Sequence, residues 1–175
     1  MKQIPLLILF SMILSVCAHG IGRTGNGIYD NEDGFKAQIP MEYSITQSMG
    51  DGNLRVIANN LNLEGENSGV PNALEILKVR EIFPEFSNYK RKELINLLLN
   101  DNWRHLSKSP SHECIEFFEY ESKSINSNVN TVEGLVLWGS QKGILIRGLK
   151  NNSNHNAIKF ILSSLKLTAG VCDWN

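Results

Sequence analysis

The sequence predicts an α+β domain with a central, largely antiparallel β-sheet and helices packed on it. Residues 113–150 have the densest β-branched and large apolar content in the chain, which is typical of buried strands. Residues 139–143, Gly-Ser-Gln-Lys-Gly, divide this stretch and have the length and chemistry of a hairpin loop. One amphipathic helix is expected before the stretch and one after it, without the regular strand–helix alternation of a parallel sheet.

Length and charge narrow the class further. The 175 residues suit one domain, long enough to bury roughly two thirds of its unfolded surface. The chain has 17 basic and 18 acidic residues, whereas a nucleic-acid-binding protein normally carries a clustered positive excess. We therefore predict no nucleic-acid partner. No internal repeat or linker divides the chain, so residues 28–175 are predicted to form a single α+β domain.

Residues 1–18 have the features of a secretory signal peptide. Lys2 supplies a positive start, residues 4–16 form an apolar run, and Val16 and Ala18 stand at the spacing that signal peptidase recognises. The run is too short for a comfortable membrane span. We predict no membrane span, cleavage after Ala18, and a mature protein in the periplasm or outside the cell.

Lipid attachment is the alternative for this N-terminus. Residues 14–17, Leu-Ser-Val-Cys, resemble a bacterial lipobox, in which Cys17 would become the acylated first residue and anchor the protein to the membrane. The motif prefers Gly, Ala or Ser where Val16 stands.

Residues 19–27 are glycine-rich and are expected to form a flexible mature N-terminus. A glycine-rich phosphate-binding loop is not predicted here, because such a loop needs a strand before it and a helix after it.

The strands before the mid-chain helix are predicted from alternation and turn signals. Residues 31–34 form a turn, and residues 35–39 alternate as a half-buried strand that Pro40 closes. Residues 54–58 suit a second strand. Residues 74–83 suit a third strand, which leads to the helix.

Two amphipathic helices are predicted. In the first, apolar residues recur at three- and four-residue spacing over residues 94–106, after a Ser87-Asn88 pair that offers an N-cap. Residues 90–92 are basic and lie at its start, which we interpret as solvated charge, with a docking surface as the alternative. The second helix carries apolar residues on one side, namely Ala157, Ile158, Ile161, Leu162 and Leu165.

The residues Y-D-N-E-D-G-F-K-A-Q-I-P at 29–40, the paired strands, the mid-chain helix, the strand meander and the final amphipathic helix resemble the PsbP-like family. The resemblance covers roughly residues 28–167, although Met41-Glu42-Tyr43 stands where the family often has glycine and tryptophan. It implies an α/β/α sandwich and export, since many bacterial members are lipoproteins or periplasmic proteins. Members mostly bind other proteins, so the resemblance supplies no catalytic residue.

No catalytic, metal or cofactor site is predicted. Ser140 lies in the predicted hairpin loop rather than in the strand-to-helix elbow of a hydrolase. His112 and Cys114 are spaced as two zinc ligands, but no second pair completes the site. Glu119 and Glu121 share one face of a strand, which we interpret as charge that protects a strand edge against aggregation.

Cys114 and Cys172 are predicted to form a disulfide. They are the only cysteines that remain after removal of the signal peptide, and export places them in an oxidising compartment. The bridge would tie the C-terminal tail to the start of the central strands. Two buried free thiols are the alternative.

The predicted function is that of an exported protein that binds another protein without a cofactor or a chemical step, as an immunity protein, inhibitor or assembly factor. Residues 59–72 are expected to form an acidic loop whose Glu64 and Glu66 contribute to the contact surface, with a solvated loop of no role as the alternative. A small secreted hydrolase is the alternative function. It would need a nucleophile beside a histidine or carboxylate of strongly perturbed pKa.

Overall fold

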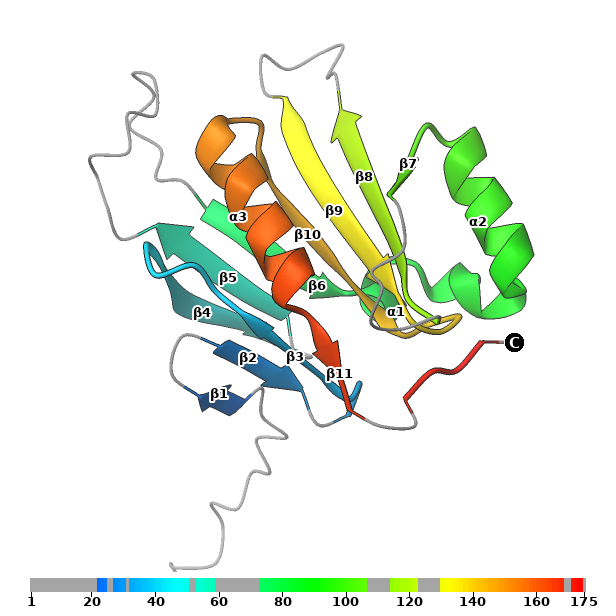
Figure 1. Cartoon of the computed structure of the whole chain (residues 1–175), viewed down its shortest axis with the longest axis horizontal. Coiled ribbons are helices and arrows are strands. Elements are labelled where there is room, and N and C mark those ends of the chain that lie inside the picture. Colours follow the sequence, from blue (N-terminus) through cyan, green and yellow to red (C-terminus); the bar gives the residue numbers. More distant parts are fainter. Residues whose placement is uncertain are drawn as a thin grey trace, which may run out of the picture.

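Two antiparallel β-sheets form the framework of the protein (Figure 1). The computed structural model describes residues 22–24, 27–30, 32–50, 53–58, 73–106, 114–122, 130–168 and 171–174, to which every structural statement below refers. The larger sheet has the strand order β4 (Tyr43–Gly50), β5 (Asn53–Ala58), β6 (Ala73–Lys78), β10 (Gly143–Leu149), β9 (Thr131–Leu137), β8 (Glu116–Ser122) and β7 (Arg104–Leu106). The smaller sheet has the order β1 (Gly22–Thr24), β2 (Gly27–Asp30), β3 (Phe35–Gln38) and β11 (Lys166–Leu167).

Helices lie on both faces of the larger sheet. Helix α3 (Asn152–Ser164) crosses one face beside the smaller sheet, as Figure 1 shows. The other face is covered by α1 (Val79–Ile82), the 3-10 helix η1 (Pro84–Asn88) and α2 (Arg91–Asn100). The prediction of an α+β fold is therefore confirmed, with a second sheet that the sequence did not separate from the first.

The central strands of the larger sheet are buried on both faces, so their side chains alternate between two apolar cores. In β9, Val132 and Val136 pack in the core that contains α3 and the smaller sheet. Leu135 and Leu137 pack in the core that contains η1 and α2. This double burial explains why the strands of residues 113–150 are continuously apolar rather than simply alternating.

Helix α3 begins at an N-cap and lies very close to β9. The side chain of Asn151 accepts a hydrogen bond from the backbone N–H of Asn154 at 2.7 Å, which satisfies one of the free donors of the first turn. At Gly134 the helix packs directly against the backbone of β9. A Cβ at this position would lie 2.6 Å from Cγ2 of Ile158 and 3.0 Å from Cδ1 of Leu162.

The first predicted helix is shorter than its apolar stripe over residues 94–106. After α2, Asn102 adopts a positive φ of 67°, and the N–H of Trp103 donates to the carbonyl of Leu98 at 3.0 Å. This is a Schellman ending, which stops a helix through a residue in the left-handed conformation. Residues 104–106, predicted as helix, instead form β7 at the edge of the larger sheet.

Three other boundaries differ from the prediction. The strand predicted over residues 74–83 ends at Lys78, and α1 follows it. The expected N-cap pair Ser87-Asn88 lies in η1, and α2 starts only at Arg91. Residues 22–24, within the segment expected to be flexible, form β1 and pair with β2. Backbone hydrogen bonds to β2 stabilise this glycine-containing strand at the sheet edge. The prediction missed it because such pairing leaves no pattern of apolar residues in the sequence.

None of the helices in the described ranges is long and apolar enough to cross a membrane. The predicted signal peptide, residues 1–18 with Cys17, lies outside these ranges.

The hairpin predicted at residues 139–143 is present between β9 and β10, where the N–H of Trp138 donates to the carbonyl of Lys142 at 2.8 Å.

Replacing Gly134 by Ala is expected to lower the free energy of unfolding by about 2 kcal/mol, because the added methyl group overlaps Ile158 and pushes α3 from the sheet. Urea denaturation of both proteins measures the change. Gly134→Ala combined with Ile158→Ala should cost less than the sum of the two single changes, because the second removes the overlapping atom. Strict additivity would contradict the close approach.

Candidate functional site

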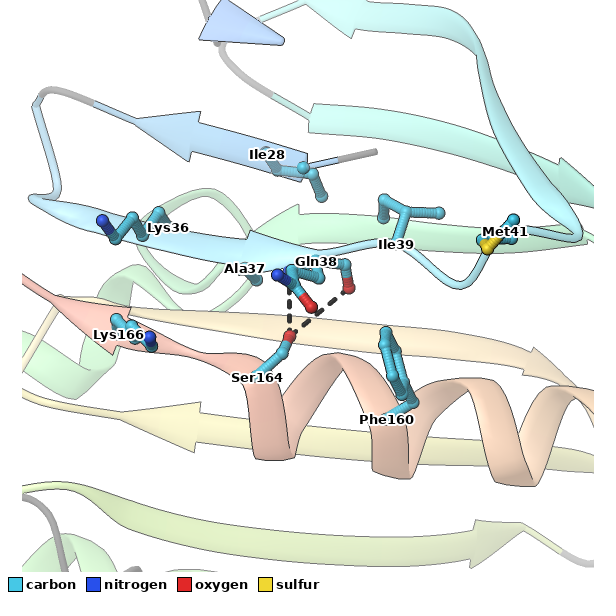
Figure 2. Close-up of a pocket in the computed structure, with 10 residues that line it drawn as sticks. Ile28, Lys36, Ala37, Gln38, Ile39, Met41, Phe160, Ser164 and Lys166 are labelled. Atoms are coloured by element: carbon cyan, nitrogen blue, oxygen red, sulfur yellow. Dashed lines mark hydrogen bonds between the residues drawn. The ribbon is translucent and has the colours of Figure 1, made fainter. Parts of the chain in front are cut away.

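An open groove lies between β3 and α3 (Figure 2). Its volume is about 490 Å³. Strands β2 and β3 form one wall, and the C-terminal half of α3 together with β11 forms the other. It is lined by Gly27, Ile28, Lys36, Ala37, Gln38, Ile39, Met41, Phe160, Ser164 and Lys166.

The groove exists because β11 pairs with only the first half of β3. The register joins Phe35 and Lys36 to β11, and beyond them β3 faces the helix. There the Ser164 hydroxyl takes the place of a strand partner, since it accepts a hydrogen bond from the backbone N–H of Gln38 at 2.8 Å. The same hydroxyl donates to the carbonyl of Ile161 at 2.8 Å, within α3. One side chain thus holds the two walls together.

One end of the groove is apolar and exposed. Met41 is 83% exposed and Phe160 is 43% exposed, and with Leu99 they are the exposed large hydrophobic residues of the described chain. A single exposed apolar side chain needs no explanation, but two that border one hollow form a local surface suited to contact. Phe160 projects from α3 toward the groove in Figure 2.

The other end of the groove carries two lysines. Lys36 and Lys166 are directly opposite each other across β3 and β11, and both side chains are exposed. Neither lysine forms an ion pair with an acidic residue of the described ranges. Like charges directly opposite on a sheet are mildly destabilising. The pair therefore leaves a positive potential at this end of the groove.

A buried ion cluster holds the smaller sheet on the larger one. Lys78, the last residue of β6, contacts Asp30 at 2.6 Å and Asp33 at 3.3 Å, and all three side chains are at most 5% exposed. Asp30 ends β2, and its Oδ1 accepts the backbone N–H of Asp33 at 3.2 Å. The indole Nε1 of Trp138 donates to the carbonyl of Asp33 at 3.2 Å. This turn is therefore bound to the larger sheet at two points.

The cluster keeps Lys78 charged. Desolvation is the largest effect and lowers the pKa of the ammonium group, but the hydrogen bond to Asp30 and the charges of Asp33 and Asp30 outweigh it. The pKa of Lys78 is thus raised above its ordinary value. Arg80 extends the cluster, since its Nη2 lies 2.8 Å from Oε2 of Glu32. The hydrogen bond from Arg80 is the main cause that lowers the pKa of the Glu32 carboxyl, and the charge of Lys78 lowers it further.

The glutamates of β8 form two ion networks on opposite faces of the sheet. Glu116 is buried and contacts Nε of Arg91 at 2.9 Å and Nε2 of His105 at 2.7 Å. Glu119, three residues further, faces the other side and contacts Nε2 of His155 at 3.1 Å. Because the two histidines lie on opposite faces, they do not meet in one site.

Glu119 does not protect an exposed strand edge, as the sequence had suggested. Strand β8 is not an edge strand there, because β7 pairs with it. Glu119 is 7% exposed and pairs with Arg104. Glu121 pairs with Lys150 at 2.5 Å. The side-chain oxygen and nitrogen atoms of Glu119, Glu121 and His155 that could bind a metal ion lie within 4.8 Å of one another. Arg104 and Lys150 already neutralise the two carboxylates, so we interpret the three residues as part of an ion-pair network.

Cys114 and Cys172 are within bonding distance as a disulfide, with their Cα atoms 6.1 Å apart. Cys114 therefore offers no thiolate for the zinc pair considered with His112, which lies outside the described residues. The tail is held further by Trp174, whose Nε1 donates to the carbonyl of Cys114 at 2.7 Å. The guanidinium of Arg91 lies 5.2 Å from the centre of the Trp174 ring. The basic start of α2 thus contributes to the fold through Arg91.

The other sequence-predicted residues have simpler outcomes. The hydroxyl of Ser140 donates to the carbonyl of Tyr89 at 3.4 Å, in the hairpin between β9 and β10. It lines a polar hollow with Ser87 and Asp173. The Nε2 atoms of His105 and His155 contact the glutamates of β8 instead of Ser140. Glu64 and Glu66 lie outside the described residues, so their role stays a prediction.

The sequence pattern does not indicate the groove. In it, Lys36 and Gln38 are only the polar positions of a half-buried strand. The available signal is Phe160, a large apolar residue that lies off the apolar side of the second helix.

Replacing Lys78 by Met is expected to lower the free energy of unfolding by about 3 kcal/mol, because it leaves the buried carboxylates of Asp30 and Asp33 without their cation. The control combines Lys78→Met with Asp30→Asn and Asp33→Asn, which should recover part of the loss. Denaturant unfolding at pH 7 compares the three proteins. Equal stability of wild type and Lys78→Met would contradict the stabilising role of the cluster.

The same cluster predicts an alkaline pH dependence. Because the folded-state pKa of Lys78 is raised, its contribution is complete below the unfolded-state pKa of about 10.4 and is lost as the pH rises through the folded-state value. The difference in unfolding free energy between wild type and the triple variant should therefore shrink above this pH. A difference that stays constant up to pH 12 would contradict the assignment.

Replacing Cys114 and Cys172 together by Ser is expected to lower the free energy of unfolding by about 4 kcal/mol, since the bridge closes a sequence separation of 58 residues. Unfolding of the unreduced wild type and of the double variant measures it. Thiol titration of denatured, unreduced mature protein should find no free thiol. Two free thiols would contradict the bridge.

Comparison with solved structures shows only remote likeness. No protein-family model matches the chain, and no curated protein matches it. A crystal structure of a protein from Bacteroides thetaiotaomicron VPI-5482 is similar to it with 11% sequence identity and a TM-score of 0.45. The match covers 85% of this chain and 50% of the other, so the chain spans half the length of that protein.

Proposed function

We propose that the protein is an exported, non-catalytic protein that binds another protein through the groove between β3 and α3. The observation that carries this proposal is that exposed apolar side chains and two lysines, which form no ion pair with a described acidic residue, line one open hollow. Aromatic residues and Met are enriched at protein interfaces, whereas a solvated surface gains nothing from exposing them.

The walls of the groove suit a macromolecular partner. Phe160 stands on α3, which is seated against β9 at Gly134, and Gln38 is held by Ser164. A rigid aromatic side chain loses little freedom on binding and so makes an efficient anchor. Because Met41 is 83% exposed, the groove leaves its occupant partly in solvent rather than enclosing it.

The predicted N-terminal signal and the disulfide support the proposal of export. The apolar run of residues 4–16 predicts transport across a membrane, and a bridge between Cys114 and Cys172 suits an oxidising compartment. The PsbP-like resemblance favours an immunity protein, inhibitor or assembly factor among exported binding proteins. The acidic loop with Glu64 and Glu66 is a second proposed contact, and Cys17 is the alternative site of a lipid anchor.

A photo-cross-linking amino acid placed at position 160 tests the proposal in the cells that produce the protein. Illumination should give a discrete adduct with one other protein, because the side chain lies at the predicted interface. The matched control places the same amino acid at position 99, where Leu99 is 46% exposed on α2, on the opposite face of the larger sheet. Position 99 should give at least tenfold less of that adduct.

Replacing Met41 and Phe160 by Ala should weaken binding of the captured partner by about tenfold or more, as expected for anchors of an interface. Surface plasmon resonance with purified proteins measures this. Equal adducts at positions 99 and 160, or turnover of peptide, ester or peptidoglycan substrates by the purified protein, would contradict the proposed function.

A further inference from the structure

We propose that the groove binds an extended, acidic segment of the partner protein, with a carboxylate between Lys36 and Lys166 and a large apolar side chain against Phe160 and Met41. This inference rests on the proposed function and specifies the chemistry of its partner. Each part of it comes from a different observation on the groove.

The carboxylate follows from the lysine pair. Lys36 and Lys166 are Cα partners in the β3–β11 register, so their side chains leave the sheet on the same face. Both side chains are exposed, and no described acidic residue forms a recorded ion pair with either one. Two neighbouring ammonium groups repel each other, and an anion between them removes the repulsion while it gains two attractions. A carboxylate of the partner fits this position.

The spacing of the two ends follows from the elements that carry them. Lys36 and Gln38 are two residues apart in β3, about 7 Å along the strand. Ser164 touches Gln38, and Phe160 lies one turn of α3 before it, about 6 Å along the helix axis. Figure 2 shows these residues in sequence along the groove, with the lysines at one end and Phe160 and Met41 at the other. Added along the two elements, the backbone positions of Lys36 and Phe160 are about 13 Å apart.

An extended peptide matches this spacing at positions i and i+4. Four residues at about 3.4 Å each span roughly 13.6 Å, and an even separation places both side chains on the same side of the chain. An acidic residue and a large apolar residue four positions apart would thus reach both ends of the groove at once. At i and i+3 the two side chains would point to opposite sides.

The middle of the groove favours a peptide over an anionic lipid. The exposed side chain of Gln38 offers an amide donor and an acceptor, and no hydrogen bond from this amide to another described residue is recorded. A peptide backbone crossing the groove can use both groups, whereas an acyl chain can use neither. Met41, at 83% exposure, also leaves too open a surface to keep an acyl chain from water.

The test is an NMR titration of the ¹⁵N-labelled mature protein with synthetic peptides at up to millimolar concentration. The first peptide is acetyl-Glu-Ser-Thr-Ser-Phe-amide, which has the i and i+4 spacing. The second replaces its Glu by Gln, and the third, acetyl-Ser-Thr-Glu-Phe-Ser-amide, places Glu beside Phe. Sodium decanoate is the fourth probe and represents an anionic lipid.

The first peptide should give saturable shifts of the amides of Lys36, Gln38, Phe160 and Lys166, with affinity at least fivefold above that of the second and third peptides. Lys36→Gln combined with Lys166→Gln should abolish this preference for Glu over Gln. Lys159→Gln is the matched control, because Lys159 is an exposed lysine of α3 that does not line the groove. The spectra of the variants also report whether they are folded.

Equal affinity of the first and second peptides, no shift in the groove with any peptide, or stronger binding of decanoate would overturn the inference. The outcome is separate from that of the proposed function. If position 160 captures a partner whose binding is unchanged by Lys36→Gln with Lys166→Gln, the partner chemistry is wrong and the proposed function stands. If position 160 captures no protein, the proposed function fails whatever the peptides do.

Discussion

The attachment of the smaller sheet to the larger one depends on the buried contact of Lys78 with Asp30 and Asp33. Burying charge is expensive unless the charges are paired, so an ion cluster at most 5% exposed fixes the geometry strictly. The partners come from the end of β6 and from the turn between β2 and β3. Since β3 forms a wall of the groove, the position of the groove follows from this contact.

The groove follows from a mismatch in length between neighbouring elements. Strand β11 has two residues and covers only Phe35 and Lys36, and α3 ends where β11 begins. The rest of β3 therefore faces a helix, which provides no backbone partner for a strand. Where β11 ends, the Ser164 hydroxyl accepts the hydrogen bond of the Gln38 backbone N–H. The space between the side chains of β3 and α3 stays open and forms the groove.

Stability and the candidate function use different parts of the molecule. The disulfide, Trp174 and the contact of Arg91 with Glu116 secure the tail and α2 at one side of the larger sheet. The networks of Glu116 and Glu119 satisfy buried carboxylates, which is a structural task. By contrast, the lysines and exposed apolar side chains of the groove contribute little to folding. A surface of this kind can therefore change its partner without loss of the fold.

The fold class, the hairpin at residues 139–143 and the pairing of two cysteines could all be predicted from the amino-acid sequence. These depend on local periodicity, on turn chemistry and on a count that allowed only one bridge in the mature chain. Helix α3 was likewise readable, because its apolar residues lie on one side over Ala157, Ile158, Ile161 and Leu162.

The residues of the candidate site come together only through long-range packing. The helical spacing of apolar residues continues past Asn102 and predicts helix there. The left-handed conformation of Asn102 instead ends α2, and residues 104–106 form a strand of the larger sheet. Lys36 and Lys166 are 130 positions apart in the sequence and meet only through the β3–β11 register, which no local pattern encodes. Long-range pairing and the packing of two sheets place such residues together, and these depend on the whole core rather than on any single segment.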